Sequence, residues 1–191
     1  SYEKVIKSTK SNLSQASSYI ALLIDQARAI AQYISQKTEV AKFANINNPS
    51  PFQKYIALES IRQDIIQLSE LNTNVESIFV YFENANIIST STYGNYLIEI
   101  LEDTAVYKAI KYPSSYIGNL RYIKDDFISK KGIITFIVKG NSYNIEIHSN
   151  VILMINFNEE TIYNIIKDVK STNPSMPILL SPNGEILSCD N

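Results

Sequence analysis

Apolar side chains recur at sevenfold spacing along the first part of the chain, which contains no Gly or Pro up to about residue 44. The main row consists of Ile6, Leu13, Ile20, Ala27, Ile34 and Ala41. A second, weaker row lies three residues further on, at Ala16, Leu23 and Ile30. The two rows predict one amphipathic helix of ~40 residues. Such a helix is ~60 Å long, so part of it should project beyond the folded body.

Two interpretations of this helix remain open. In the first, it packs along its own domain. In the second, it is a stalk that pairs with a second copy and leads towards a membrane. Both can hold for different turns of the same helix.

A second helix follows the breaker segment 45–49. Ser50 is a suitable N-cap, Pro51 suits the first helical position, and Gln53 completes a capping box, which predicts a helix over about 51–71. The period then changes to that of strands, and segments 77–82 and 87–90 predict a β-hairpin.

The rest of the chain continues with strands and single helices. We expect a helix from Tyr96 to about Ile110, strands at 133–138, 143–147 and 151–157, a helix capped by Asn158, and a hairpin at 178–188. The strand at 151–157 is apolar enough to lie at the centre of a sheet. This order predicts an α+β fold, an antiparallel sheet with helices on its faces.

Composition narrows the class of protein. The chain has 191 residues and a net charge of −2, which argues against nucleic-acid binding. No stretch approaches the ~20 apolar residues of a membrane span, and no secretory signal is visible. The chain lacks an initiator Met, so we expect it to be part of a longer protein.

The sequence offers little for catalysis. His148 is the only histidine and Cys189 the only cysteine, which leaves too few ligands for a zinc site. Five glycines assemble neither a P-loop nor a dinucleotide fingerprint. We therefore expect no enzyme, no catalytic residues, no metal and no cofactor.

The chain is rich in tyrosine, with 13 Tyr and no Trp. Between the middle helix and the later strands, aromatic, basic and acidic side chains gather that together suit a pocket for a small polar metabolite. The candidate ligand-binding residues are Tyr107, Tyr116, Arg121, Tyr122 and Asp125. The alternative is that these tyrosines simply lie half-buried on a sheet.

Three segments carry a resemblance to a known family: the long helix followed by 75–90, the strand and cap at 151–163, and the hairpin at 177–188. Together they resemble the Cache (extracellular PAS-like) sensor domains of bacterial histidine kinases, chemoreceptors and membrane-bound AraC-type regulators. Tyr116 and Arg121 have the spacing of the amino-acid-binding branch, although the Trp of that pattern is absent here.

The resemblance implies a long N-terminal helix packed on a PAS-like antiparallel sheet. It divides the chain into a stalk and dimerisation helix (1–48), a sensor domain (49–172) and a terminal hairpin (173–191). Two interpretations of the hairpin are open: the start of a truncated second module, or the last part of the first sheet. It also implies a location on the extracellular side of the cell membrane, a membrane anchor in the full-length protein, and a homodimer formed through the N-terminal helix.

We therefore expect the ligand-sensing domain of a bacterial transmembrane receptor, which binds a small polar molecule and signals through its long helix. The alternative is a dimeric coiled-coil interaction module without a small-molecule ligand.

Overall fold

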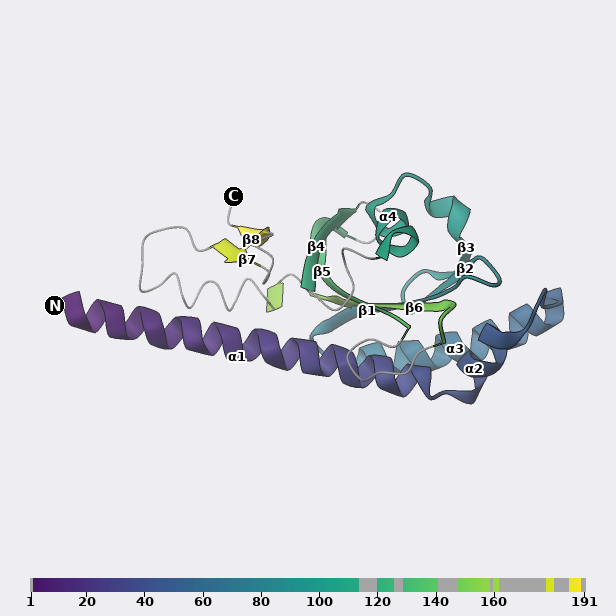
Figure 1. The fold of residues 1–191 in the computed structure, drawn as a ribbon, viewed down its shortest axis with the longest axis horizontal. Coiled ribbons are helices and arrows are strands. Elements are labelled where there is room, and N and C mark those ends of the chain that lie inside the picture. The colour runs from purple at the N-terminus through teal and green to yellow at the C-terminus, as the bar shows by residue number, and fades with distance from the viewer. Residues whose placement is uncertain are drawn as a thin grey trace.

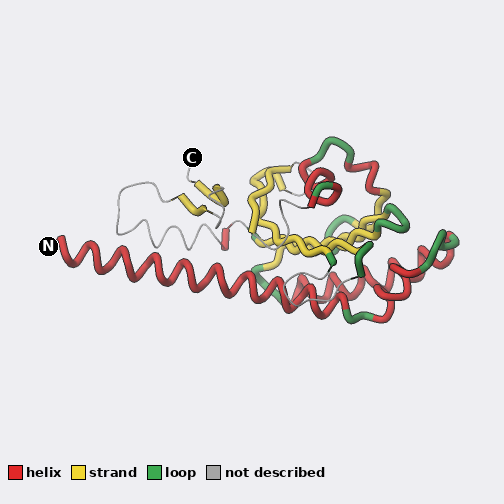
Figure 2. The backbone as a smooth tube through the Cα atoms, viewed as in Figure 1, coloured by secondary structure: helices red, strands yellow, loops and turns green. Residues whose placement is uncertain are grey.

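The computed structural model describes residues 2–113, 120–125, 129–140, 148–158, 160–161, 178–180 and 186–189. A long helix runs along one side of a curved antiparallel sheet, and a short helix lies on the other side (Figure 1). The same layers appear in Figure 2, where the helices flank the strands. This arrangement confirms the predicted α+β fold with a long N-terminal helix.

Helix α1 (Tyr2–Ser35) extends well beyond the six-stranded sheet (Figure 1). Its heptad row changes environment along the helix. Ala27 and Ile34 are buried beside the sheet, whereas Ile6 and Leu13 are 50% and 56% exposed. The C-terminal half of α1 therefore belongs to the core, and the N-terminal half carries an exposed apolar row.

The predicted single helix to residue 44 is interrupted. Lys37 has an extended backbone, and the chain continues as α2 (Thr38–Asn45). The turn has a tertiary cause, because it buries Val40 and Phe43 of α2 in the core. The Phe43 ring meets the Phe82 ring edge to face, with 4.8 Å between centroids. A straight helix would carry these apolar side chains away from the sheet.

Helix α3 (Pro51–Leu71) begins as the sequence predicts. The backbone N–H of Gln53 donates to Ser50 Oγ, and the backbone N–H of Ser50 donates to Gln53 Oε1. This capping box satisfies two N–H groups that a helix start leaves without partners. The inner face of α3 buries Leu58, Ile61 and Ile65.

Six strands form one sheet in the order β3-β2-β1-β6-β5-β4, and every neighbouring pair is antiparallel. The strands are β1 (Val75–Phe82), β2 (Ile87–Thr90), β3 (Gly94–Leu97), β4 (Leu120–Asp125), β5 (Ser129–Lys139) and β6 (Val151–Phe157). Strands β1 and β6 lie at the centre, which confirms both the predicted hairpin and the central position of 151–157. All seven residues of β6 are buried.

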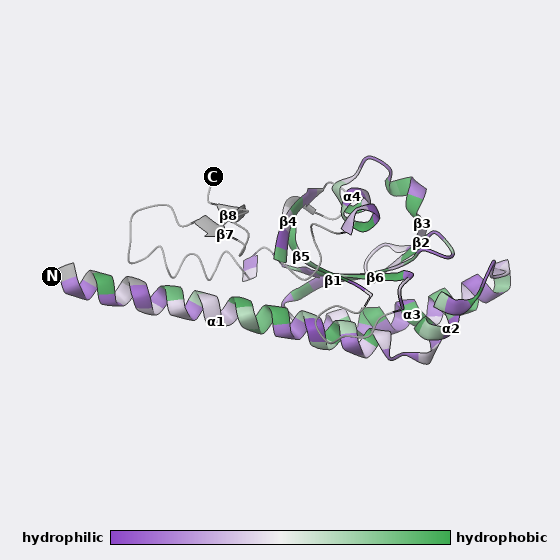
Figure 3. Ribbon diagram, in the orientation of Figure 1, coloured by the Kyte–Doolittle hydropathy of each residue, from purple (hydrophilic) through white to green (hydrophobic). Residues whose placement is uncertain are grey.

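The sheet is covered on both faces. On one face, which we call the helix-layer face, alternate strand residues such as Val80 and Leu153 pack with α1, α2 and α3. On the opposite face, the α4 face, Phe79 and Met154 pack with η1 (Ile98–Leu101) and α4 (Ala105–Lys111). Figure 3 shows apolar residues concentrated along β5 and β6, between the two layers. Two-sided burial explains the nearly continuous apolar run of β6.

The middle of the chain differs from the sequence prediction. In place of one helix from Tyr96 to Ile110, the structure has the end of β3, the 3-10 helix η1 and the short helix α4. Two local features explain the division. Asp103 adopts a φ of +74°, which ends the preceding turn, and Thr104 Oγ1 accepts a hydrogen bond from Tyr107 N at 3.0 Å to cap α4.

The remaining predictions fall partly outside the described residues. The strand expected at 143–147 lies outside them, as does most of the helix expected after Asn158. Asn158 Oδ1 accepts a hydrogen bond from Glu160 N at 2.9 Å, as expected of a cap. The predicted terminal hairpin is present as β7 (Ile178–Leu180) and β8 (Ile186–Cys189), a separate two-stranded sheet.

Candidate functional site

A row of polar residues crosses four neighbouring strands on the α4 face. Strand register pairs Arg121 with Thr135, Thr135 with Asn156, and Asn156 with Ser77. All four residues are buried. We call them the polar row. Buried polar side chains in an otherwise apolar layer are costly unless they have partners, so the polar row is the first candidate for a binding site.

The Asn156 amide is only partly hydrogen-bonded within the described residues. Asn156 Nδ2 donates to Ser77 Oγ at 3.0 Å, and this bond fixes the orientation of the amide. Asn156 Oδ1 is buried and accepts no hydrogen bond among the described residues. Thr135 Oγ1 lies 3.5 Å from the carbonyl oxygen of Ile155, at the long limit for a hydrogen bond. The row therefore presents an unused acceptor, Asn156 Oδ1, on the face that α4 covers.

Apolar residues flank the polar row on both sides along the strands. Ile123 pairs with Ile133 on one side, and Phe79, Met154 and Ile137 form the next row on the other side. Adjacent strands are ~4.8 Å apart, so the backbones of Arg121 and Asn156 are separated by about 10 Å. This separation is within the span of a small molecule, and apolar side chains lie on either side of the row.

A second polar cluster lies further along the same face. Lys111 Nζ in α4 donates to Tyr81 Oη at 2.8 Å and to Asn86 Oδ1 at 3.0 Å. Asn86 Nδ2 donates in turn to Glu99 Oε1. Burial lowers the pKa of Lys111, but the Tyr81 hydrogen bond and nearby charges outweigh it, so this pKa is raised above 10.5. These bonds attach the end of α4 to the hairpin of β1 and β2.

The structure brings together only some of the residues predicted from the sequence. Arg121 lies in the polar row, and Tyr107, in α4, packs on the same face of the sheet. Tyr122 follows Arg121 in an extended strand and therefore lies on the helix-layer side, 36% exposed. Asp125 ends β4, at the edge of the sheet, and Tyr116 lies outside the described residues. Segment 120–125, for which the sequence predicted no strand, is the edge strand β4.

Sequence reasoning missed three members of the row: Ser77, Thr135 and Asn156. Two of the three could have been recognised in the sequence. Thr135 and Asn156 interrupt two of the most apolar runs in the chain, at positions where a buried strand would normally hold an aliphatic side chain. The strand pairing that places them side by side could not be read from the chain, because their segments are far apart in sequence.

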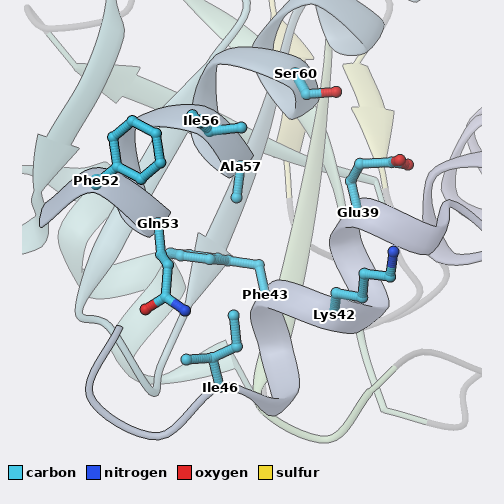
Figure 4. Close-up of a pocket in the computed structure, with 9 residues that line it drawn as sticks. All are labelled: Glu39, Lys42, Phe43, Ile46, Phe52, Gln53, Ile56, Ala57 and Ser60. Carbon is cyan, nitrogen blue, oxygen red and sulfur yellow. The ribbon is translucent and has the colours of Figure 1, made fainter. Parts of the chain in front are cut away.

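A separate pocket of about 370 Å³ lies between α2 and α3 (Figure 4). Its walls are mostly apolar, with Phe43 and Ile46 on one side and Phe52, Ile56 and Ala57 on the other. It belongs to the helix layer, not to the α4 face. Among the described residues, the polar row places a buried cation, Arg121, on the same face of the sheet as a buried acceptor, Asn156 Oδ1.

No group of three or more His, Cys, Asp or Glu side chains in the described ranges is arranged to hold a metal ion. None of the described helices is both long enough and apolar enough to cross a membrane.

The fold resembles a known sensory domain. The ligand-binding domain of the Campylobacter jejuni chemoreceptor Tlp3, in complex with L-norvaline, matches with a TM-score of 0.55 and 13% identity, over 98% of this chain and 70% of that chain. Two other structures of the Tlp3 domain, with isoleucine and with L-valine, have TM-scores of 0.44 and 0.40 at 13% and 14% identity, and each covers 95% of this chain and 74% of its own.

No family model and no curated protein matches the sequence. At this level of identity, the first structural match establishes a common fold. That fold, a long N-terminal helix packed on an antiparallel sheet, is the one that the resemblance to Cache domains implied.

Proposed function

We propose that this chain is the ligand-sensing domain of a bacterial signalling receptor and that it binds a small polar molecule on the α4 face. The polar row is the observation that carries the proposal. The common fold with the ligand-binding domain of a chemoreceptor supports it. In the full-length protein, we expect this domain on the extracellular side of the membrane.

The polar row supplies complementary groups for such a ligand. The Arg121 guanidinium is a planar fork of donors suited to a carboxylate. Asn156 Oδ1 is an acceptor for a ligand N–H or O–H. A buried acceptor without a partner costs about 1–3 kcal/mol, and a ligand donor would remove that cost on binding.

The sheet connects this site to α1. Thr135 lies on the α4 face, while its neighbours Ile134 and Phe136 lie on the helix-layer face, where β5 and β6 contact α1. A ligand that favours one packing of these strands would bias the position of α1. Such a shift is limited by the difference in ligand affinity between the two packings. We expect the stiff α1 helix to carry it beyond the sheet.

A thermal-shift screen against metabolites tests the proposal, because a ligand that binds only the folded state raises the melting temperature. Arg121→Met and Thr135→Val should reduce the shift produced by any hit. Tyr122→Ser serves as the matched control, since it alters the adjacent residue on the opposite face, and its shift should stay at the wild-type value. Circular dichroism of each unliganded variant checks that it folds.

A hit that stabilises Arg121→Met and Thr135→Val as much as the wild type would contradict this assignment of the site. A chain that binds no metabolite but self-associates through α1 would instead favour a dimeric interaction module. The exposed Ile6 and Leu13 of α1 are the observation that keeps this second function open.

A further inference from the structure

The turn between β1 and β2, residues 83–86, bonds to α4 through the side chain of Asn86. Asn86 Oδ1 accepts hydrogen bonds from Lys111 Nζ of α4 at 3.0 Å and from Tyr81 Oη at 2.8 Å. Lys111 Nζ also donates to Tyr81 Oη at 2.8 Å, so the three side chains are joined pairwise. The position of the turn therefore depends on that of α4.

The same turn bonds to the helix layer through Asn84. Its Nδ2 donates to the carbonyl oxygens of Phe43 and Ile46, both at 2.9 Å. Just before β6, Asn150 Nδ2 donates to the carbonyl oxygen of Ala44. These carbonyls lie at the C-terminal end of α2, where a helix leaves its last C=O groups without partners inside the helix. Because an isolated helix of eight residues is not stable in water, α2 depends on contacts of this kind.

Backbone hydrogen bonds keep Asn84 and Asn86 in a fixed relation to each other. At the start of the turn, Glu83 N donates to Asn150 O at 2.9 Å, and at its end Ile98 N donates to Asn86 O at 3.0 Å. Asn86 adopts a φ of +56°, the left-handed conformation of a tight turn. Only one residue separates the two side chains, so a displacement of Asn86 also displaces Asn84.

We propose that the β1–β2 turn couples α4 to α2. Loosening α4 weakens the contacts that stabilise the end of α2, and loosening α2 acts on α4 in the same way, because coupling between two parts of a protein is reciprocal. A ligand that shifts α4 would therefore also change α2. The coupling is a property of the unliganded chain, so it is tested without a ligand and separately from the proposed function.

Hydrogen exchange measured residue by residue provides the test, because it reports local opening of a helix. Lys111→Met and Tyr81→Phe each remove hydrogen bonds at the α4 end of the turn. Each should accelerate exchange of the α2 amides 41–46 by about threefold or more, since the loss of one hydrogen bond has an effect of this order. Lys108→Met, at an exposed position of α4, is the matched control and should keep the wild-type rates. The α3 amides 61–68 should keep them in all three variants.

The reciprocal experiment starts from the other end of the turn. Asn84→Ala should accelerate exchange of the α4 amides 109–112 by about the same factor. Asn45→Ala is its control, because it removes a hydrogen bond of 2.9 Å to the Ala41 carbonyl within α2 and leaves the turn intact. Equal effects of these two variants on α4, including no effect, would overturn the coupling.

Three results of the first experiment would also overturn it. They are wild-type exchange of α2 in Lys111→Met or in Tyr81→Phe, an equal rise in α2 and α3, and a similar rise of α2 exchange in Lys108→Met. None of these results bears on ligand binding, which the thermal-shift screen decides independently.

Discussion

Among the glycines that the structure describes, Gly132 in β5 has the least room for a side chain. Its φ of +90° lies in a region that L side chains rarely adopt, and an added Cβ would lie 2.3 Å from Tyr122 Oη. Gly140 also has a positive φ, +60°, but a Cβ there would meet no atom within 4 Å. A side chain at Gly140 would therefore cause backbone strain alone, whereas a side chain at Gly132 would cause both backbone strain and steric overlap.

Gly132→Ala should lower the free energy of unfolding by about 2–4 kcal/mol, through backbone strain and overlap with the Tyr122 ring. Gly140→Ala should cost about 1 kcal/mol, because only the backbone is strained there. Urea denaturation measures both values. Adding Tyr122→Ser to Gly132→Ala should recover part of the loss, and equal losses for the two glycine variants would disprove the steric contribution.

Single residues also show how far the candidate site could be predicted. Arg121 was identified from the sequence because a lone Arg among tyrosines suits an anion site. Tyr122 was grouped with it by proximity in sequence, yet neighbouring residues of a strand lie on opposite faces. Asn156 and Ser77 meet only through the pairing of β1 with β6. Their contribution depends on long-range topology that one sequence does not specify.

Among the elements, helix α3 was predicted to within a residue because its start is encoded locally. Ser50→Ala removes the hydroxyl that accepts from Gln53 N, and it should lower the free energy of unfolding by about 1 kcal/mol. Urea denaturation would measure the loss. Ser14→Ala, at an exposed position inside α1, is the control and should be neutral or slightly stabilising, since Ala favours helix interiors. A loss at Ser14 as large as at Ser50 would contradict the role of the cap.

The turn between α1 and α2 was not predicted, because no Gly or Pro marks it. Polar contacts of Lys37 with other parts of the fold stabilise the turn. Lys37 Nζ lies 3.1 Å from Asp64 Oδ1 of α3 and 4.6 Å from the centroid of the Tyr33 ring. Hydrogen bonding to Tyr33 and to Asp64 raises the pKa of Lys37 above 10.5. The chain therefore changes direction where tertiary contacts favour it, and these contacts are invisible in the local sequence.

Lys37→Met should lower the free energy of unfolding by about 0.5–1 kcal/mol at pH 8, since this ion pair is only partly shielded from solvent. The raised pKa means that the folded state binds the proton more tightly than the unfolded state. The contribution is therefore complete below pH 10.5 and declines as the pH rises through the raised pKa. Urea denaturation of both proteins at pH 8 and at strongly alkaline pH measures the difference, which should shrink at the higher pH. A difference that stays constant would show that the Lys37 charge is not involved.

At the scale of the whole molecule, α1 joins a buried half to an exposed half. The exposed half carries Ile6 and Leu13, one heptad apart, which suits a paired helix. If the chain forms a homodimer through α1, the double variant Ile6→Asp and Leu13→Asp should shift it towards monomer in sedimentation velocity, with an unchanged melting temperature of the monomer. Ser11→Asp and Ser18→Asp, exposed at other positions of the same helix, form the matched control. Equal association of both double variants would exclude this row as the interface.

The overall architecture was predicted better than its details. Periodicity distinguished helices from strands, and the apolar run at 151–157 correctly indicated a central strand. The division of 96–110 was missed, because Leu97, Leu101 and Ala105 have helical spacing although they belong to three different elements. Spacing alone does not reveal the positive φ of Asp103 that separates them.

The neighbouring positions of β1 and β6 have a consequence for biosynthesis. A chain that emerges from the ribosome or a translocation channel with its N-terminus first can form the meander of β1, β2 and β3 early, but the 53 residues 98–150 must then follow before β6 arrives. Until then, β1 has an open edge with unpaired backbone groups, and such edges invite pairing with other nascent chains. Slow elongation or export through residues 98–150 should therefore increase misassembly, whereas the same delay after residue 157 should not.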